Sequence, residues 1–218
     1  YVDAKIERQV LDYDDLLLYW LHLMGDPGAA QRIGARFDHV LVDEYQDTNS
    51  LQAEILRRLK PSGQGVTVVG DDAQSIYAFR AATVRNILDF PKQYDPPATV
   101  LTLAQNYRSN QAILDAANAV IGLAKERFTK DLFTSRRGGA RPSLVTVADE
   151  DAQVNWVADR ILEQREAGVA LRQQAVLFRA AHHSDALEVE LQRRNIPFVK
   201  YGGLRFLEAA HVKDALSC

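Results

Sequence analysis

The sequence predicts an α/β fold with parallel sheets, and three observations support that class. Short apolar runs typical of strands alternate along the chain with segments whose apolar residues recur at helical spacing. The 218 residues are 47% hydrophobic and 25% charged, which is enough apolar material for a substantial core. Acidic side chains follow one of the apolar runs directly, and the carboxyl ends of parallel strands are where such sheets bind ligands.

The first three predicted elements are a helix, a strand and a helix. Residues 10–23 are apolar at helical spacing, and Gly25 and Pro27 end this helix. Residues 39–42 form a short apolar run that ends in acids, which is typical of a buried parallel strand. Asn49 is a suitable cap for an amphipathic helix that runs to about residue 59.

The next elements are a strand, two short helices and another strand. Proline and glycine form a turn before an apolar strand over 66–69. Short helices are predicted near 73–79 and 83–90, and a proline-rich loop then leads to a third strand over 99–103.

The second half of the chain repeats this alternation after a break near residues 104–108. Helices are predicted over 109–123, 154–162 and 187–191, and strands over 144–147, 175–178 and 196–200. The chain therefore divides into two α/β halves of similar size.

Composition excludes several other classes of protein. The single cysteine, Cys218, excludes a disulfide framework and a cysteine zinc site and favours a reducing, cytoplasmic location. No apolar run approaches the roughly 20 residues that span a bilayer, so we expect no membrane partner. The net charge of −3 excludes a wholly basic nucleic-acid coat but leaves room for a local basic groove.

The most informative segment follows the run that ends at Val42. Asp43 and Glu44 come next, at the carboxyl edge of the predicted sheet. Phosphoryl transfer from a nucleotide needs a carboxylate for Mg²⁺ and a group that orients and deprotonates the attacking water. Adjacent Asp and Glu can divide these tasks. The alternative is a charged turn, and Gln46 and Asp47 in the same segment argue against it.

A second polar segment follows the next predicted strand. Gly70 permits a tight turn beside a ligand, and the neutral amide of Gln74 can contact a phosphate oxygen or a water. Tyr77, Phe79 and Arg80 combine aromatic rings with a cation, which is a stacking platform for unpaired bases. Burial of the two rings in the core is the alternative.

Together these segments resemble the UvrD/Rep/PcrA-like superfamily 1 DNA helicases. Four stretches match motifs of that family in its order: D-E-Y-Q-D at 43–47 (its second motif, the Walker B element), V-G-D-D-A-Q-S-I-Y-A-F-R-A-A at 69–82 (its third motif), Q-N-Y-R-S at 105–109 (its fourth motif) and Y-G-G-L-R-F-L-E at 201–208. The resemblance implies parts of two RecA-like parallel-sheet motor domains. Residues 1–105 would be the later part of the first, and residues 106–218 the first part of the second.

The resemblance also implies roles in ATP hydrolysis. Asp43 and Glu44 would be the Mg²⁺ residues, and Glu44 would activate the hydrolytic water. Gln74 would sense the γ-phosphate. Tyr107 would lie against the adenine, and Arg108 would act as an arginine finger, for which its planar, permanently charged fork is suited.

For DNA, the resemblance implies that Tyr77 and Phe79 stack on single-stranded bases, with Arg80 in the same cluster. The family most often has Trp where Phe79 stands, so less stacking surface is retained. Tyr201 and Arg205 are the candidate DNA contacts near the end of the chain.

The implied activity is an ATP-dependent DNA helicase that moves on single-stranded DNA and unwinds duplex. Its partners would be ATP, Mg²⁺, single-stranded and duplex DNA, and accessory repair or replication proteins. No G-x-x-x-x-G-K-[ST] phosphate loop occurs in the sequence, so we expect an interior fragment that hydrolyses ATP negligibly by itself. The alternatives are a non-catalytic truncated module that binds DNA or a protein partner, and the motor portion of a helicase–nuclease.

Basic residues also crowd a loop after the fourth motif: Lys125, Arg127, Lys130, Arg136, Arg137 and Arg141. Two interpretations stay open for this loop, a nucleic-acid contact and a solvated surface.

Overall fold

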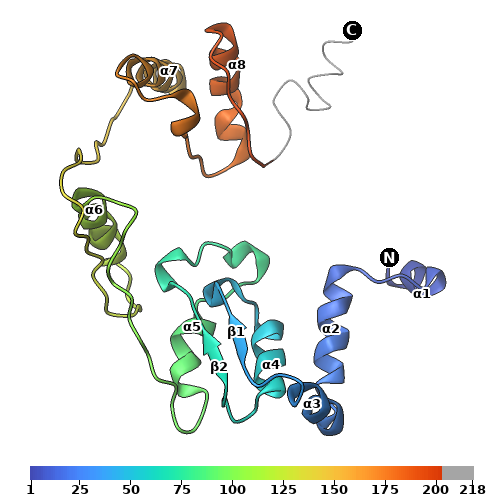
Figure 1. Ribbon diagram of the computed structural model, residues 1–218. Coiled ribbons are helices and arrows are strands. Elements are labelled where there is room, and N and C mark those ends of the chain that lie inside the picture. The colour runs from blue at the N-terminus through green and yellow to red at the C-terminus, as the bar shows by residue number, and fades with distance from the viewer. Residues whose placement is uncertain (203–218) are drawn as a thin grey trace. The chain divides into compact units, whose positions relative to one another are not determined.

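The computed structural model describes residues 1–202 of the chain (Figure 1). The chain forms two compact units, Tyr1–Pro142 and a second that begins at Ser143. These units are defined by which segments pack together, and that does not test where one motor domain ends and the next begins. The boundary between residues 105 and 106 stays a prediction. No helix among the described residues has both the length and the apolar character needed to cross a bilayer.

The centre of the first unit is a parallel pair of strands, which confirms the α/β class. Strands β1 (Val40–Val42) and β2 (Val66–Val68) pair in parallel with Val40 opposite Val66. Parallel strands need a crossover connection, and α4 (Ser50–Leu59) provides it. Within residues 1–202 these two are the only strands of a sheet.

One face of this sheet carries the core of the unit. The four valines at the strand ends pack against Tyr45, Leu56, Ile87 and Phe90, all of them buried. On the opposite face Leu41 is 77% exposed. The prediction of a fully buried strand at 39–42 is therefore wrong for that face, because no helix of the described residues covers it.

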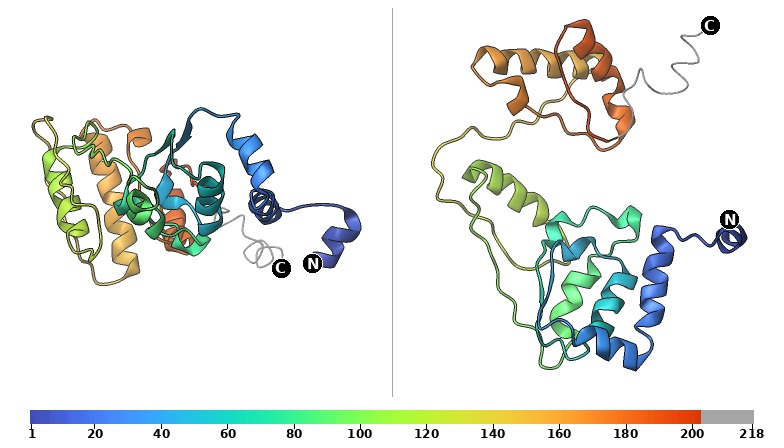
Figure 2. Two further views of the ribbon diagram at one scale, coloured as in Figure 1. Left: turned by 90° about the horizontal axis from the view of Figure 1, so that it is seen from below. Right: turned by 45° about the vertical axis from the view of Figure 1, so that its right-hand side comes forward.

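Helix α4 holds the sheet and the N-terminal helices together (Figure 2). The side chain of Asn49 caps it by accepting a hydrogen bond from the Gln52 N–H, as the sequence predicts. Leu56 faces the sheet, while Ile55 packs on Met24 and neighbouring apolar residues. Both faces of this helix are therefore used in packing.

The other elements of the first unit are helices and 3₁₀ turns. Its helices are α1 (Val2–Arg8), α2 (Tyr13–Leu23), α3 (Pro27–Gly34), α5 (Arg85–Asp89) and α6 (Gln111–Ile121), with 3₁₀ turns η1 (Tyr45–Asp47), η2 (Asp72–Gln74), η3 (Ala78–Arg80) and η4 (Phe90–Lys92). The helix predicted near 73–79 is thus two separate 3₁₀ turns. Helix α6 lies within the helix predicted over 109–123, and the Asn110 side chain caps it by accepting the Ile113 N–H at 3.1 Å.

The described part of the second unit, residues 143–202, contains only helices as regular elements. They are α7 (Glu150–Glu166), η5 (Leu171–Gln173), η6 (Ala181–Ser184) and α8 (Asp185–Arg193). Ala158 of α7 is fully buried against Leu187, Leu191 and Ile196, so its small side chain lets α7 and α8 approach closely. Lys200 pairs with Glu188 at 2.6 Å, and both side chains are buried.

Four predicted strands do not form in the structure: 99–103, 144–147, 175–178 and 196–200. A strand is held by backbone hydrogen bonds to a neighbour, and no segment among residues 1–202 supplies a ladder to any of the four. Leu101, Leu144 and Leu177 are 83%, 97% and 92% exposed. An apolar run alone therefore does not define a strand when the pairing partner is absent.

Candidate active site at the carboxyl edge of the sheet

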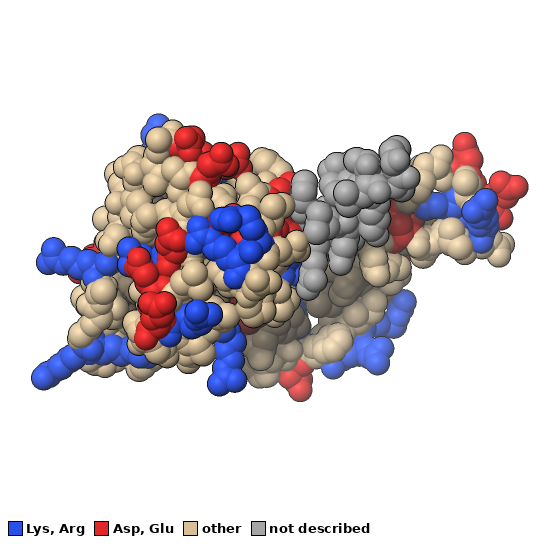
Figure 3. All heavy atoms as spheres, turned by 90° about the horizontal axis from the view of Figure 1, so that it is seen from above, with Lys and Arg blue, Asp and Glu red and all other residues tan. Residues whose placement is uncertain are grey.

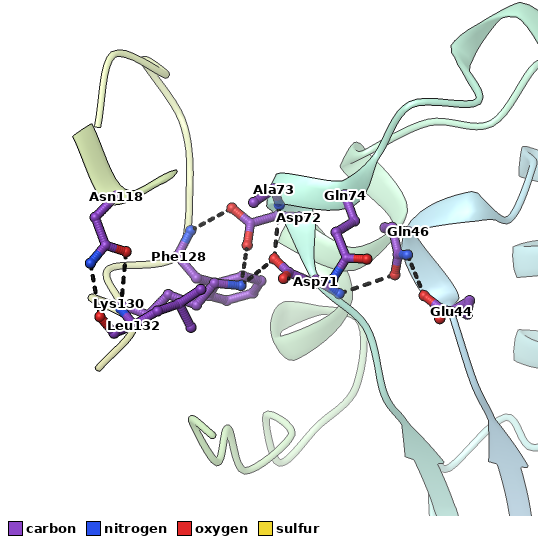
Figure 4. A network of polar contacts seen from close by, with 10 residues as sticks. All are labelled: Glu44, Gln46, Asp71, Asp72, Ala73, Gln74, Asn118, Phe128, Lys130 and Leu132. Carbon is purple, nitrogen blue, oxygen red and sulfur yellow. Dashed lines mark hydrogen bonds and ion pairs between the residues drawn. The ribbon is translucent and has the colours of Figure 1, made fainter. Parts of the chain in front are cut away.

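The ends of β1 and β2 bring the two predicted polar segments together. The Val69 N–H donates to the Val42 carbonyl at 2.8 Å, and the Tyr45 N–H donates to the Val69 carbonyl at 3.0 Å. These bonds carry the parallel register beyond the strands, so the residues after Val42 and after Val69 leave the sheet side by side (Figure 4). The shared sheet edge predicted from the sequence is confirmed.

Both carboxylates of the first segment face solvent. Asp43 and Glu44 are exposed, and the Asp43 Oδ1 accepts the Glu44 N–H at 2.9 Å. Glu44 has φ 50° and ψ 43°, a left-handed conformation that is uncommon for a residue with a side chain. Such strain often accompanies function. Here the chain turns sharply after β1, into η1, at the residue predicted to activate water.

Gln46 connects the two strand ends, a role that the sequence did not indicate. It is 1% exposed. Its Nε2 donates to the Glu44 Oε2 at 2.6 Å, and its Oε1 accepts the Asp71 N–H at 3.0 Å. A Cβ on Gly70 would lie 2.5 Å from this Oε1, so glycine is needed at that position. A buried amide thus holds the exposed Glu44 carboxylate in one position.

The Asp71 carboxylate accepts hydrogen bonds from two other residues of the second segment. Its Oδ2 accepts the Gln74 Nε2 at 2.9 Å, and its Oδ1 accepts the Ala73 N–H at 3.0 Å. Burial raises the pKa of Asp71, and the hydrogen bonds from Gln74 and Lys130 lower it. The lowering is the larger effect, so the pKa of Asp71 lies below its usual value. Glu44 and Gln74 are therefore linked through Gln46 and Asp71, by side-chain bonds at every step except the Asp71 backbone N–H (Figure 4).

Lys130 of the basic loop is directed into this cluster. Its Nζ forms ion pairs with Asp71 and with Asp72, the latter at 3.1 Å. Burial lowers the pKa of Lys130, but the bonds to both carboxylates raise it more, so the ammonium stays charged. The sequence left two interpretations open for this loop, a nucleic-acid contact and a solvated surface. Neither applies to Lys130, because its charge is paired with carboxylates inside the protein.

The aromatic residues of the second segment form one group, in which Tyr77 is half-buried and Phe79 is exposed. The rings of Tyr77 and Phe79 have centroids 5.8 Å apart, and the Arg80 guanidinium lies 5.2 Å and 5.5 Å from them. Phe79 is 68% exposed, which argues against the core alternative. Its role in contacting bases stays a prediction.

The fourth motif has an ordered backbone and open side chains. The Asn106 Oδ1 accepts the N–H groups of Arg108 and Ser109 at 2.9 Å and 2.8 Å. Tyr107 is 73% exposed, and its carbonyl accepts the Arg136 Nη1 at 3.0 Å. Among residues 1–202 the Arg108 guanidinium has no hydrogen-bond or ion-pair partner, so no contact joins it to Glu44 or Gln74.

The last two predicted site residues lie near the end of the chain. Tyr201 is 88% exposed. Arg205 lies outside the described residues. On the face shown in Figure 3, acidic and basic side chains are interspersed, in keeping with the small net charge of the chain.

The donor set at the sheet edge fits Mg²⁺. No group of three or more metal-ligating residues occurs in the described part of the chain. Mg²⁺ bound with a nucleotide usually takes only one or two carboxylates and completes its shell with phosphates and water. Two exposed, adjacent carboxylates at Asp43 and Glu44 match that requirement.

Comparison with known proteins identifies the family. The model of the UvrD/REP helicase N-terminal domain matches residues 1–95, and the model of the UvrD-like helicase C-terminal domain matches residues 101–218. The chain belongs to the UvrD-like helicase family. The family resemblance stated from the four sequence motifs is therefore confirmed.

Individual relatives agree with this assignment. The UvrD-like chain is 39% identical over 221 residues to DNA helicase II of Escherichia coli, which covers 100% of this chain and 30% of the relative. It is 36% identical over 211 residues to the ATP-dependent DNA helicase PcrA of Staphylococcus epidermidis, covering 96% and 29%. It is 38% identical over 217 residues to PcrA of Leuconostoc citreum, covering 98% and 29%. The chain thus spans about 30% of the length of the curated relatives it matches.

Proposed function

We propose that the complete protein encoded by the gene that carries this sequence is an ATP-dependent DNA helicase, which moves along single-stranded DNA and unwinds duplex. The observation that carries the proposal is the polar chain from Glu44 through Gln46 and Asp71 to Gln74 at the carboxyl edge of a parallel sheet. The names of the UvrD-like relatives, ATP-dependent DNA helicase and DNA helicase II, support the same activity.

Hydrolysis is assigned to the carboxylates after β1. Asp43 and Glu44 would hold Mg²⁺, which when bound neutralises phosphate charge and orients the nucleotide. Glu44, fixed by the Gln46 amide at 2.6 Å, accepts a proton from the attacking water. Gln74, held by Asp71, donates to the γ-phosphate or to that water.

The remaining nucleotide contacts come from the fourth motif. Tyr107 stacks on the adenine, and Arg108 contacts the γ-phosphate as charge develops in the transition state. The open side chains of both residues are available for a ligand. Residues 1–105 and 106–218 would then belong to the first and second motor domains.

DNA binding is assigned to the aromatic group. Tyr77 and Phe79 stack on successive bases, and Arg80 adds a cation beside both rings. Tyr201 and Arg205 are proposed as further DNA contacts. This activity implies that the protein acts on cellular DNA in the cytoplasm. Its protein partners would be repair or replication proteins.

A non-catalytic module that binds DNA or a protein partner is the second candidate. One observation favours it, namely that the 218 residues contain no G-x-x-x-x-G-K-[ST] loop to hold the phosphates. The 218-residue chain by itself is therefore expected to bind DNA without measurable ATP turnover.

The test compares two proteins, the complete gene product and the 218-residue chain. We expect the complete product to hydrolyse ATP faster when single-stranded DNA is added and to separate a labelled duplex, and the chain to do neither. Absence of DNA-stimulated turnover in the complete product would favour the binding module. Turnover by the chain alone would overturn the expectation that a phosphate loop is needed.

A further inference from the structure

The segment after α6 contacts both nucleotide motifs of the first unit. At its N-terminal end, the Phe128 N–H donates to the Asp72 Oδ2 at 3.1 Å, and Lys130 pairs with Asp71 and Asp72. Farther along, the Asn106 N–H donates to the Phe133 carbonyl at 2.7 Å. Among the described residues, the segment 128–136 is therefore the one stretch that forms hydrogen bonds both with the motif at 69–82, which contains Gln74, and with the motif at 105–109, which contains Arg108.

This segment 128–136 is itself firmly attached. The side chain of Asn118, in α6, bonds both backbone groups of Leu132, at 2.9 Å and 3.0 Å. The Thr134 N–H donates to the Gln111 Oε1 at 3.1 Å. Because Gln111 and Asn118 belong to one helix, the segment has a rigid base, and its contacts with the two motifs are set by α6.

Lys130 has a further electrostatic role. Asp43 and Glu44 follow β1, and Asp71 and Asp72 follow β2, so four carboxyl groups lie at the sheet edge where an anionic nucleotide would bind. Among residues 1–202, Lys130 is the only cation paired with any of them. Its side chain is 15% exposed, so its charge acts where solvent screening is weak. Removing it would leave the carboxylates of Asp71 and Asp72 without a cation beside the phosphates of the nucleotide.

We propose that Lys130 is a positioning residue for ATP hydrolysis: from the segment 128–136 it holds Asp71, which fixes Gln74 directly and Glu44 through Gln46. This rests on the proposed function. Lys130 does not touch the nucleotide in this account. It fixes the positions of Glu44 and Gln74, which do, and it offsets the negative charge of Asp71 and Asp72.

The first test measures the positions directly in the 218-residue chain. Amide hydrogen exchange is followed in the wild type, Lys130→Met, Lys130→Arg and the exposed control Lys92→Met. We expect Lys130→Met to speed exchange of the Asp71 and Ala73 amides at least about tenfold, with little change in the other two variants. Faster exchange confined to residues 126–133 would overturn the proposal, because Lys130 would then anchor only its own loop.

The second test measures turnover in the complete gene product with saturating single-stranded DNA. We expect Lys130→Met to lower kcat roughly 10- to 100-fold, as for other groups that orient a catalytic residue. Lys130→Arg should recover most of it, since a guanidinium can also bridge two carboxylates. A purely structural role would give equal losses in the two variants, and that result would overturn the proposal. So would a kcat of Lys130→Met within twofold of wild type.

Two further outcomes are distinguishable. If Lys130→Met does not fold, Lys130→Gln replaces it and should show the same pattern at smaller size. A wild type without ATP turnover overturns the proposed function, and with it the contribution of Lys130 to hydrolysis. The exchange experiment then still decides whether Lys130 positions Asp71.

Discussion

The residues of the first unit that are proposed to act on the nucleotide fall into two groups. Glu44 and Gln74 belong to a fixed cluster, whereas Tyr107 and Arg108 form an open segment. Glu44 and Gln74 are held by side-chain hydrogen bonds of 2.6 Å and 2.9 Å from neighbours that are themselves bonded. Tyr107 and Arg108 have a fixed backbone, but the tyrosine is 73% exposed and the arginine has no side-chain partner in residues 1–202. The groups proposed to carry out hydrolysis are thus held in place by the protein, whereas the groups proposed to contact the nucleotide depend on a ligand to place them.

This difference predicts separable effects of mutation. A change in the fixed cluster should alter stability and activity together, because its side chains also satisfy buried groups. A change in the open segment should alter activity alone.

The largest expected effect is on the open segment. Arg108→Ala in the complete gene product should lower kcat for ATP about 10³-fold, since an arginine finger is worth that much or more in other nucleotide hydrolases. The Tm of the 218-residue chain should not change, because the guanidinium has no partner in the described residues. A drop in Tm with Arg108→Ala would contradict the division between fixed and open segments.

The aromatic group extends the same comparison to DNA. Phe79→Ala should weaken binding of a labelled oligothymidine by about 10- to 100-fold in Kd, because stacking is worth roughly 1–3 kcal/mol per base. Phe79→Trp should bind at least as tightly as wild type, and fluorescence anisotropy measures both. Equal Kd values for Phe79→Ala and wild type would show that this ring does not contact bases.

A substitution in the fixed cluster should act mainly on stability. An added methyl in Gly70→Ala would lie 2.5 Å from the Gln46 Oε1 and 2.6 Å from the Ile87 Cδ1. We expect a loss of about 1–3 kcal/mol in the free energy of unfolding, measured in urea. Gly138→Ala is the control for the added methyl, since nothing lies within 4 Å of that position, although its φ of 79° adds backbone strain of its own. A Gly70→Ala chain no less stable than this control would contradict the close approach to Gln46.

The smallest expected effect is a dependence on pH. The pKa of Asp71 is below its usual value, so the folded chain favours the ionised carboxylate. That contribution is fully present above the unfolded pKa near 3.9 and is lost as pH falls through the folded pKa. The Tm difference between wild type and Asp71→Asn should therefore be largest near neutral pH and shrink below about pH 4. A difference that grows on acidification would mean that Asp71 folds in its protonated form.

Sequence patterns predicted the parts of this fold that depend on local chemistry. The strand–acid junction at Val42 and Asp43, the Asn49 cap and the sheet edge all follow from residue type and spacing. The four strands that failed to form depend on pairing partners, which no periodicity can supply. The contacts of Gln46 and Lys130 with Asp71 were missed for the same reason, because Asp71 lies 25 and 59 residues away from them.

One feature of the sequence does distinguish the region of Lys130. Lys130 lies in a loop with an unusual density of basic residues, and the two interpretations considered for that loop both directed its charge outward. The nearby pair of acids at Asp71 and Asp72 has no other cation in the described residues, and only the folded chain shows where their compensation comes from.

The most direct test of the central claim is turnover of Glu44→Gln in the complete gene product. The claim is that the cluster after β1 and β2 is the hydrolytic site. We expect kcat to fall by about 10²-fold or more, since a general base contributes that much, while the Kd for ATP stays within a few-fold of wild type. A Glu44→Gln protein that hydrolyses ATP at the wild-type rate would place the chemistry elsewhere and contradict the account.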